Sequence, residues 1–527
     1  MKNILKKHGL VKSIGISLTI LSLIASVITL FFKNEEIALV VNIISCLIML
    51  IGLFMMAIMA EKNRLFKSLG VFILASIIFT WILPYGYFQG TDYYDYGMAR
   101  VGLGDIGMAL YYSAYFSIDK IIYLFVLGGF YGVLSICNGY KALVNKIAKI
   151  FAKKEILLAL IISFLLTGLT SIMSQSMAIL ILIPFFVSIL SQMKIDKLST
   201  FVITFGSSLV GILGASYGTE SLAIFNRYLG TELTLGLTYR FIVLAVSYVL
   251  YAFFIVMRLR KVLKSKDKSL VVDDPFKVEE PKKKYSIIPA LIAMIIIFAF
   301  VIIGYIAWET NWKITTFNKF HEWLTTLTIG NDFAIFAQIL GKNAVALGTF
   351  DMIMSPSILL VAAFLFAVIN RVKFAEIVDS FYNGAKKMIR PTMMFFGIYL
   401  VFVICYMSPF IPTISNWMFN LTESFNPFIT SFIALLSSAF HTDLGYTAYT
   451  VGTYVASAYA GDLAIAHTIY VTTYGLVQLF LPTGIILMIG LALMDIDYKT
   501  WLKYIWLFVV GIIIILLVLF TVVTYIA

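Results

Sequence analysis

Four short polar stretches interrupt apolar sequence and contain the residues best suited to binding chemistry. The stretches "TSIMSQS" (170–176) and "AFHTDLG" (439–445) lie inside apolar runs, and "GASYGTES" (214–221) and "LPTG" (481–484) follow them in turn. Hydroxyl and carboxylate groups in such stretches can bind a small substrate or a cation. The candidate substrate- or ion-binding residues are Ser171, Ser174, Ser176, Ser216, Thr219, Glu220, Thr442, Asp443 and Thr483.

The backbone of these stretches also favours binding. Gly214 and Gly218 free the chain, and Pro482 lacks the amide proton that a continuous helix needs, so helices should break at these points. A broken helix exposes amide groups, which suit a substrate carboxylate, and carbonyl groups, which suit a cation. A simple kink would explain one such stretch, whereas four at matched positions favour a binding site.

Glu220 and Asp443 are the acidic residues nearest the expected middle of the membrane. Acids at that depth are costly and usually functional. Glu220 could pair with a cationic substrate, bind an ion or carry a proton, or it could be an interfacial acid near Arg227. His441, in the same polar stretch as Asp443, is either a proton site or a hydrogen-bonded buried histidine, and both interpretations stay open.

Composition identifies the class of protein that holds these stretches. Of the 527 residues, 61% are hydrophobic and 13% are charged, against about 25% charged residues in soluble proteins. Mean hydropathy is +0.98, and apolar stretches of spanning length recur. We therefore predict an all-α polytopic membrane protein. The net charge of +12 is concentrated in short loops, which is a signal of topology and not of a nucleic-acid partner.

The apolar runs and basic loops together predict a topology. The basic N-terminus and the loop 61–67 place the N-terminus in the cytoplasm of a multi-pass protein of the cell membrane. We expect outer segments at 85–118 and 309–351 and amphipathic inner-surface helices at 141–154 and 371–389. The predicted spanning helices are 13–32, 37–60, 68–84, 119–137, 198–216, 237–257, 286–308, 352–370, 391–409, 463–480 and 503–525.

Two further stretches, 155–192 and 425–460, are too long for one crossing and too short for two. Each is split by a polar tip, so we predict two re-entrant hairpins. The count of crossings makes them enter from opposite faces, which defines two inverted-topology repeats, each also containing a broken transmembrane helix. The predicted domains are an N-terminal transmembrane hairpin (1–67), a first repeat (68–257), a cytoplasmic basic linker (258–285) and a second repeat (286–527).

Motifs for catalysis are missing from the sequence. It has no nucleophile–base pattern, Walker loop, HExxH motif or cysteine cluster, and its three cysteines lie far apart in apolar segments. We therefore expect no enzyme activity, no metal and no cofactor. Without an ATPase domain, any transport should be secondary, with Na⁺ or H⁺ as possible coupling ions.

Several longer motifs resemble the YfcC-type permeases, which belong with the anaerobic four-carbon dicarboxylate carriers of the ion transporter superfamily. They are "TWILPYGYFQG" (80–90), "VLGGFYGVLSICNGY" (126–140), "EIVDSFYNGAKKMI" (376–389) and "LPTGIILMIGLALMDIDYKTWLKYIW" (481–506). The resemblance implies two inverted repeats, binding sites at the hairpin tips and breaks, and a homodimer. It also implies exchange of basic amino acids, or transport of dicarboxylates as in related carriers.

The chain departs from the family pattern at its polar positions. Leu481 stands where the family has asparagine, Tyr474 where an aspartate is common, and the tip "AFHTDLG" is bulkier than usual. Because the tips carry acids and no basic residue, we favour an amino acid over other small carboxylate-bearing metabolites, moved through the lipid bilayer by alternating access. The alternatives are a dicarboxylate or organic-anion carrier, and a non-transporting scaffold derived from a carrier.

Overall fold

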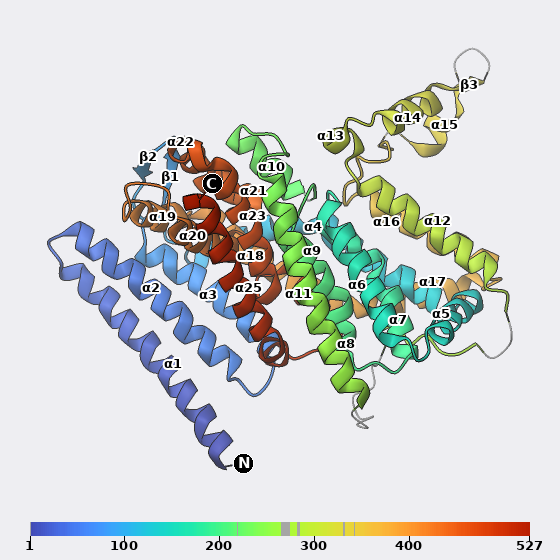
Figure 1. The fold of residues 1–527 in the computed structure, drawn as a ribbon, viewed down its shortest axis with the longest axis horizontal. Helices are drawn as coiled ribbons and strands as arrows, with labels where there is room; N and C mark the ends of the chain where they lie inside the picture. The colour runs from blue at the N-terminus through green and yellow to red at the C-terminus, as the bar shows by residue number, and fades with distance from the viewer. Residues whose placement is uncertain are drawn as a thin grey trace. The chain divides into compact units, whose positions relative to one another are not determined.

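The structure is a computed structural model that describes residues 2–218, 220–264, 274–281, 285–329, 333–341 and 343–526, with side chains from Gly9 to Tyr525 (Figure 1). Helices make up most of it. Two antiparallel hairpins supply short strands, β1 (Gly86–Gln89) with β2 (Asp92–Asp95), and β3 (Thr328–Ile329) with β4 (Phe333–Ala334).

Ten helical segments of the described chain are long and apolar enough to cross a membrane, and they make this an all-α polytopic membrane protein. They contain α1 (Lys2–Ile28), α2 (Glu35–Ile58), α3 (Arg64–Ile82), α4 (Ile106–Ile136), α6 (Glu155–Ile172), α11 (Leu237–Lys264), α12 (Ile288–Tyr305), α18 (Ile389–Met407), α23 (Leu463–Phe480) with α24 (Ile485–Leu493), and α25 (Tyr498–Ile526).

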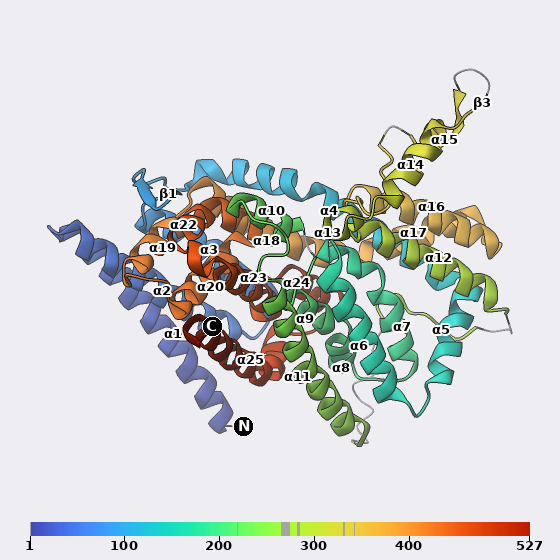
Figure 2. The ribbon, with the colours of Figure 1, turned by 45° about the horizontal axis from the view of Figure 1, so that its top comes forward.

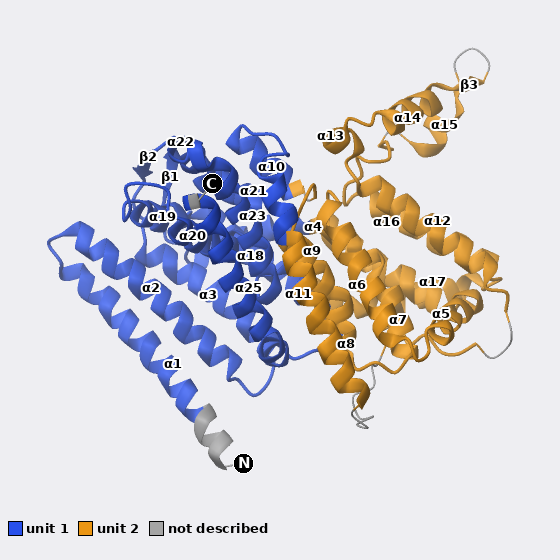
Figure 3. Cartoon of the chain, viewed as in Figure 1, with its two compact units in different colours: residues 1–117, 221–243, 393–527 blue, residues 118–220, 244–392 orange. Residues whose placement is uncertain are grey.

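The chain forms two compact units, and the first comprises residues 1–117, 221–243 and 393–527 (blue in Figure 3). In it α1 and α2 lie side by side (Figure 1, Figure 2), and a Cβ added at Gly52 would come within 2.7 Å of the Gly15 carbonyl oxygen. Small residues allow this close approach of membrane helices. This unit also contains α3, the first part of α4, the start of α11, α10 (Glu220–Leu229), α19 (Ile411–Phe419), α20 (Pro427–His441), α21 (Leu444–Thr447), α22 (Thr453–Ala458), α18, α23, α24 and α25.

The second unit comprises residues 118–220 and 244–392 (orange in Figure 3). Within it α4 crosses α17 (Phe374–Lys387) at small residues, since a Cβ at Gly128 would come within 2.7 Å of the Gly384 carbonyl oxygen. This unit also contains α6, most of α11, α12, α5 (Asn138–Ile150), α7 (Ile183–Gln192), α8 (Lys197–Phe201), α9 (Ser207–Leu213), α13 (Trp308–Trp312), α14 (Thr316–Thr326), α15 (Ile335–Leu340) and α16 (Met354–Ile369), with a 3₁₀ segment, η3 (Ser176–Ile181).

Helices are interrupted at all four polar stretches that the sequence singles out. The chain leaves α6 at Ile172 and resumes as η3 at Ser176, and it leaves α20 at His441 and resumes as α21 at Leu444. The other two breaks separate α9 from α10 and α23 from α24. The breaks are therefore confirmed. Re-entrant insertion, inverted repeats and the predicted domains stay predictions. The two compact units described above combine other parts of the chain.

Three expectations differ from the structure. The outer segment 85–118 is not all loop, because it forms β1 and β2 and already begins α4 at Ile106. The span expected at 352–370 is the 16-residue α16, which starts where the Asp351 carboxylate accepts hydrogen bonds from the amides of Ile353 and Met354. Helix α19 was not predicted, since nine residues give too little periodicity to recognise.

The basic linker at 258–285 is also shorter and less solvated than predicted. Helix α11 continues to Lys264, and residues 265–273 and 282–284 lie outside the described residues. Residues 274–278, which we call the 274–278 strap, pack against other parts of the second unit. Phe276 and Val278 are buried, and the Val278 carbonyl accepts a hydrogen bond from Gln192 Nε2. Apolar side chains within the charged run account for this packing.

Candidate functional site

In the second unit, the break after α6 is bonded to the break after α9. The carbonyl oxygen of Ser171 accepts hydrogen bonds from the amides of Ser216 and Gly218 at 3.0 and 2.9 Å, and the two serine hydroxyl oxygens lie 3.3 Å apart. A Cβ at Gly218 would come within 2.7 Å of the Ser171 and Met173 carbonyl oxygens, so glycine is required for this contact. These two polar stretches are therefore connected directly through their backbones.

The same connection fixes Ser174 and Glu220. The amide and hydroxyl of Ser174 both donate to the carbonyl oxygen of Tyr305, at 2.7 and 2.8 Å. The Glu220 amide donates to the Ser174 carbonyl, and the exposed Glu220 carboxylate accepts a hydrogen bond from Gln175 Nε2. We call Ser171, Ser174, Gln175, Ser216 and Glu220 the first cluster. Ser176 begins η3 beside it, and Thr219 lies outside the described residues.

In the first unit, Asp443 organises the break between α20 and α21. One oxygen of its carboxylate accepts the Tyr446 amide at 3.0 Å, which caps α21, and the other accepts the hydroxyl of Ser221 at 3.4 Å. Thr442 adopts a left-handed conformation (φ 58°), and its carbonyl accepts a hydrogen bond from the Tyr474 hydroxyl at 3.5 Å. We call Ser221, Thr442, Asp443 and Tyr474 the second cluster.

At the break between α23 and α24, two buried side-chain donors have no partner among the described residues. Gln478 Oε1 accepts the Ile485 amide at 2.7 Å, which orients the side-chain amide and leaves its Nε2 unpaired among the described residues. The fully buried Thr483 hydroxyl likewise finds no partner among the described residues. Gly484, which precedes α24, supplies no side-chain cap. We call Gln478, Thr483 and the first amides of α24 the α24 site.

These contacts divide the predicted site residues among three places. Ser171, Ser174, Ser216 and Glu220 come together in the first cluster, Thr442 and Asp443 in the second, and Thr483 in the α24 site. No described contact joins Thr483 to Thr442 or Asp443. Along the chain, Glu220 ends the first cluster and Ser221 begins the second.

Four residues of these places were not predicted as site residues: Gln175, Ser221, Tyr474 and Gln478. A usable signal existed for Gln478, which lies four residues before Pro482, where a proline interrupts helical hydrogen bonding. Arg240 was also missed as a buried basic residue. It is 1% exposed and donates to the carbonyls of Leu233 and Leu235 in the first unit.

His441 and His467 are both buried in the first unit. His441 Nδ1 lies 3.1 Å from the Thr447 hydroxyl oxygen, and its ring packs edge-on against Tyr446. His467 packs against Phe225. Among the described residues, no three His, Cys, Asp or Glu side chains gather in a group that could hold a metal ion.

Ten apolar helical segments among the described residues make this a polytopic membrane protein, and the match to a family of carriers makes it a membrane transporter. The chain belongs to the DcuC family, described as the C4-dicarboxylate anaerobic carrier family, whose model matches residues 44–525. No curated protein matches it. Among solved structures it is similar to MtrF of Neisseria gonorrhoeae, from a report on a class of antimetabolite efflux pumps. That match has 11% identity and a TM-score of 0.37, and covers 88% of this chain and 95% of that one.

Proposed function

We propose that this protein is a secondary active transporter of a small carboxylate-bearing metabolite, with a four-carbon dicarboxylate as the favoured substrate. The α24 site is the observation that carries the proposal. Its Thr483 hydroxyl and Gln478 Nε2 are buried donors without partners in the described structure. A buried polar group left unpaired costs about 1–3 kcal/mol, and hydrogen bonds to a bound substrate would remove that cost for both donors.

The chemistry of the α24 site suits a carboxylate. The Thr483 hydroxyl and the Gln478 Nε2 can both donate hydrogen bonds. The N-terminus of a helix adds amide donors and a partial positive charge, which favour an anion. A substrate carboxylate would therefore exchange its hydrogen bonds to water for hydrogen bonds from these donors, and the α24 site would need no lysine or arginine to bind it. Amino acids and dicarboxylates both carry a carboxylate that these donors could bind. Other groups of the protein must therefore distinguish between the two substrates.

Two arguments favour a dicarboxylate over an amino acid. The Asp443 carboxylate already accepts the Tyr446 amide and the Ser221 hydroxyl, so it is committed to capping α21 and has less capacity for a substrate ammonium group. The family description also names C4-dicarboxylates as what its carriers move. The sequence favours an amino acid because the polar tips carry no basic residue. Arg240 weakens that argument, because it is a buried basic residue in the same unit as the α24 site.

An amino acid is the second candidate, and Glu220 is the observation that favours it. Its carboxylate is exposed and accepts one described hydrogen bond, from Gln175, so it could also pair with an ammonium group. The resemblance to YfcC-type permeases supports the same candidate and would make the transporter an antiporter for basic amino acids. With either substrate, we propose a homodimer in the cell membrane whose N-terminus is cytoplasmic. Transport would proceed by alternating access, with Na⁺ or H⁺ as a possible coupling ion.

Uptake into proteoliposomes containing the purified full chain tests the proposal. Labelled succinate, arginine and a neutral amino acid would each be offered with a sodium gradient, a proton gradient or internal counter-substrate. We expect succinate to accumulate. Accumulation of arginine alone, weakened by Glu220→Gln, would replace the first candidate with the second. Folded protein that takes up none of the three would contradict transport and favour the scaffold alternative.

A further inference from the structure

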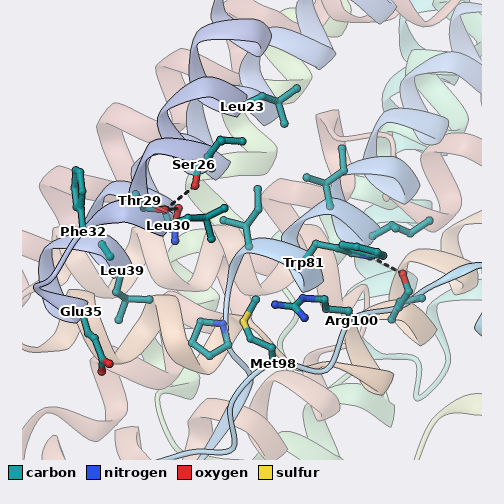
Figure 4. Close-up of a pocket in the computed structure, with 18 of the residues that line it drawn as sticks. Leu23, Ser26, Thr29, Leu30, Phe32, Glu35, Leu39, Trp81, Met98 and Arg100 are labelled. Atoms are coloured by element: carbon teal, nitrogen blue, oxygen red, sulfur yellow. Dashed lines mark hydrogen bonds between the residues drawn. The ribbon is translucent and has the colours of Figure 1, made fainter.

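A large pocket in the first unit has no part in the sites described above. It has a volume of about 1100 Å³, slightly above the range of about 300–1000 Å³ typical of small-molecule sites. Its walls come from the end of α1, the start of α2, the end of α3 and residues 95–106 (Figure 4). All of these segments belong to one compact unit.

The walls of this pocket are apolar and belong to membrane helices. Val27 of α1, Leu30 of the 3₁₀ turn after it (Thr29–Phe31), Trp81 of α3 and Ile106 of α4 line it, and each is exposed in the structure. Exposed apolar side chains on spanning helices face hydrocarbon, because no water is present at that depth to favour polar ones. The Trp81 indole is held in place by a hydrogen bond to the Val101 carbonyl oxygen at 2.8 Å. Acyl chains are therefore the natural contents of this part of the pocket.

The rim of the same pocket carries charges of both signs. Arg100 extends into it beside Trp81, and Glu35 lies at the turn from α1 to α2 (Figure 4). Glu36 and Asp95 complete the charged lining. Arg100 makes no hydrogen bond or ion pair within the described chain, so its guanidinium is available to a ligand. Guanidinium groups bind phosphate through two parallel hydrogen bonds, and carboxylates pair with ammonium groups.

We propose that this pocket binds a zwitterionic aminophospholipid, with its phosphate at Arg100, its ammonium group at Glu35 and Glu36, and an acyl chain along α1 and α3. The mixed charge of the rim selects this occupant. An anionic lipid without an amine would bring its negative headgroup to three carboxylates, and a neutral lipid would leave Arg100 unpaired. A lipid held here would stabilise the contact of the α1–α2 hairpin with α3.

Native mass spectrometry of the full chain released from nanodiscs tests this site. The nanodiscs would contain equal amounts of phosphatidylethanolamine and phosphatidylglycerol. We expect the protein to retain phosphatidylethanolamine, and we expect Arg100→Gln to reduce the retained fraction about tenfold, as the loss of a charge-assisted hydrogen bond implies. The matched control is Lys33→Gln, an exposed residue of the same turn that does not line the pocket and should leave retention unchanged.

Further variants make the result decisive. Arg100→Lys keeps the charge but loses the two parallel hydrogen bonds, so it should retain more of this lipid than Arg100→Gln and less than the unmodified protein, which separates phosphate binding from misfolding. The double variant Glu35→Gln with Glu36→Gln should shift the preference toward phosphatidylglycerol. Preferential retention of phosphatidylglycerol by the unmodified protein, or equal retention by the Arg100→Gln and Lys33→Gln variants, would overturn the proposal. Transport activity is not a readout here, so failure of the proposed function would leave this test intact.

Discussion

At the scale of single residues, Thr483 and Asp443 have opposite circumstances, although both were predicted as site residues from their polar character. Asp443 has two described hydrogen-bond partners, whereas the Thr483 hydroxyl has none among the described residues. Sequence identifies a polar residue at a helix break, but whether its side chain caps the next helix depends on backbone angles that form only in the fold. The free donors of the α24 site could therefore not be predicted from composition or spacing.

Replacing Asp443 separates its capping from any role in binding. Asp443→Ala removes the acceptor for the Tyr446 amide and should reduce the free energy of unfolding by about 1 kcal/mol, whereas Asp443→Asn keeps an acceptor and should change it little. Thermal unfolding in detergent measures both variants. A lower Tm for Asp443→Asn, equal to that of Asp443→Ala, would show that the charge and not the cap stabilises the break.

At the scale of elements, the sequence predicts the breaks well and the packed loops poorly. Glycine, proline and polar residues mark the four breaks because their effect on a helix is local. The 274–278 strap and α19 escaped prediction because tertiary contacts stabilise them. Phe276, for example, packs against the ring of Tyr131, which lies far away in the sequence. A charged run with a few apolar residues gives no local sign of such a contact.

Two glycines test the connection between the breaks of the second unit. In Gly218→Ala the new methyl group would meet the carbonyl oxygens of Ser171 and Met173, so we expect a loss of about 1–3 kcal/mol in the free energy of unfolding. The matched control is Gly168→Ala in α6, where a Cβ meets nothing within 4 Å and the helix should gain up to about 1 kcal/mol. Equal Tm values for the two variants would contradict the described connection.

The stability of the fold around the 274–278 strap should depend on pH through the ionisation of Asp274. Burial raises the pKa of this carboxyl group, although hydrogen bonds from the Phe276 and Val278 amides, together with the charge of Lys387, act in the opposite direction. Tyr140 also faces it. Because the pKa in the folded protein is raised, the neutral carboxyl stabilises the fold at acidic pH, and this contribution disappears as the pH rises through that pKa.

Asp274→Asn checks this direction. The variant cannot ionise, so its Tm relative to the unmodified protein should rise as the pH increases from about 4 to about 8. Thermal unfolding at several pH values measures the difference. A difference that stays constant across this range would mean that Asp274 does not change its ionisation in the folded protein.

At the scale of the whole molecule, the compact units combine distant parts of the chain. The first unit takes residues 221–243 from the middle of the sequence and joins them to both ends of the chain. Composition and hydropathy identify a polytopic membrane protein, and the resemblance indicates the broader carrier group. They do not indicate this division, because it depends on which helices pack together and not on where apolar runs begin and end.

Uptake of labelled succinate by proteoliposomes carrying Thr483→Val or Thr521→Val tests the central claim most directly. Both variants replace one threonine hydroxyl by a methyl group, but the Thr521 hydroxyl only donates back to the Leu517 carbonyl in α25. We predict that Thr483→Val reduces uptake about tenfold or more, as loss of a hydrogen bond to a charged group implies, and that Thr521→Val leaves it unchanged. Equal uptake by the two variants, from equally folded protein, would contradict carboxylate binding at the α24 site.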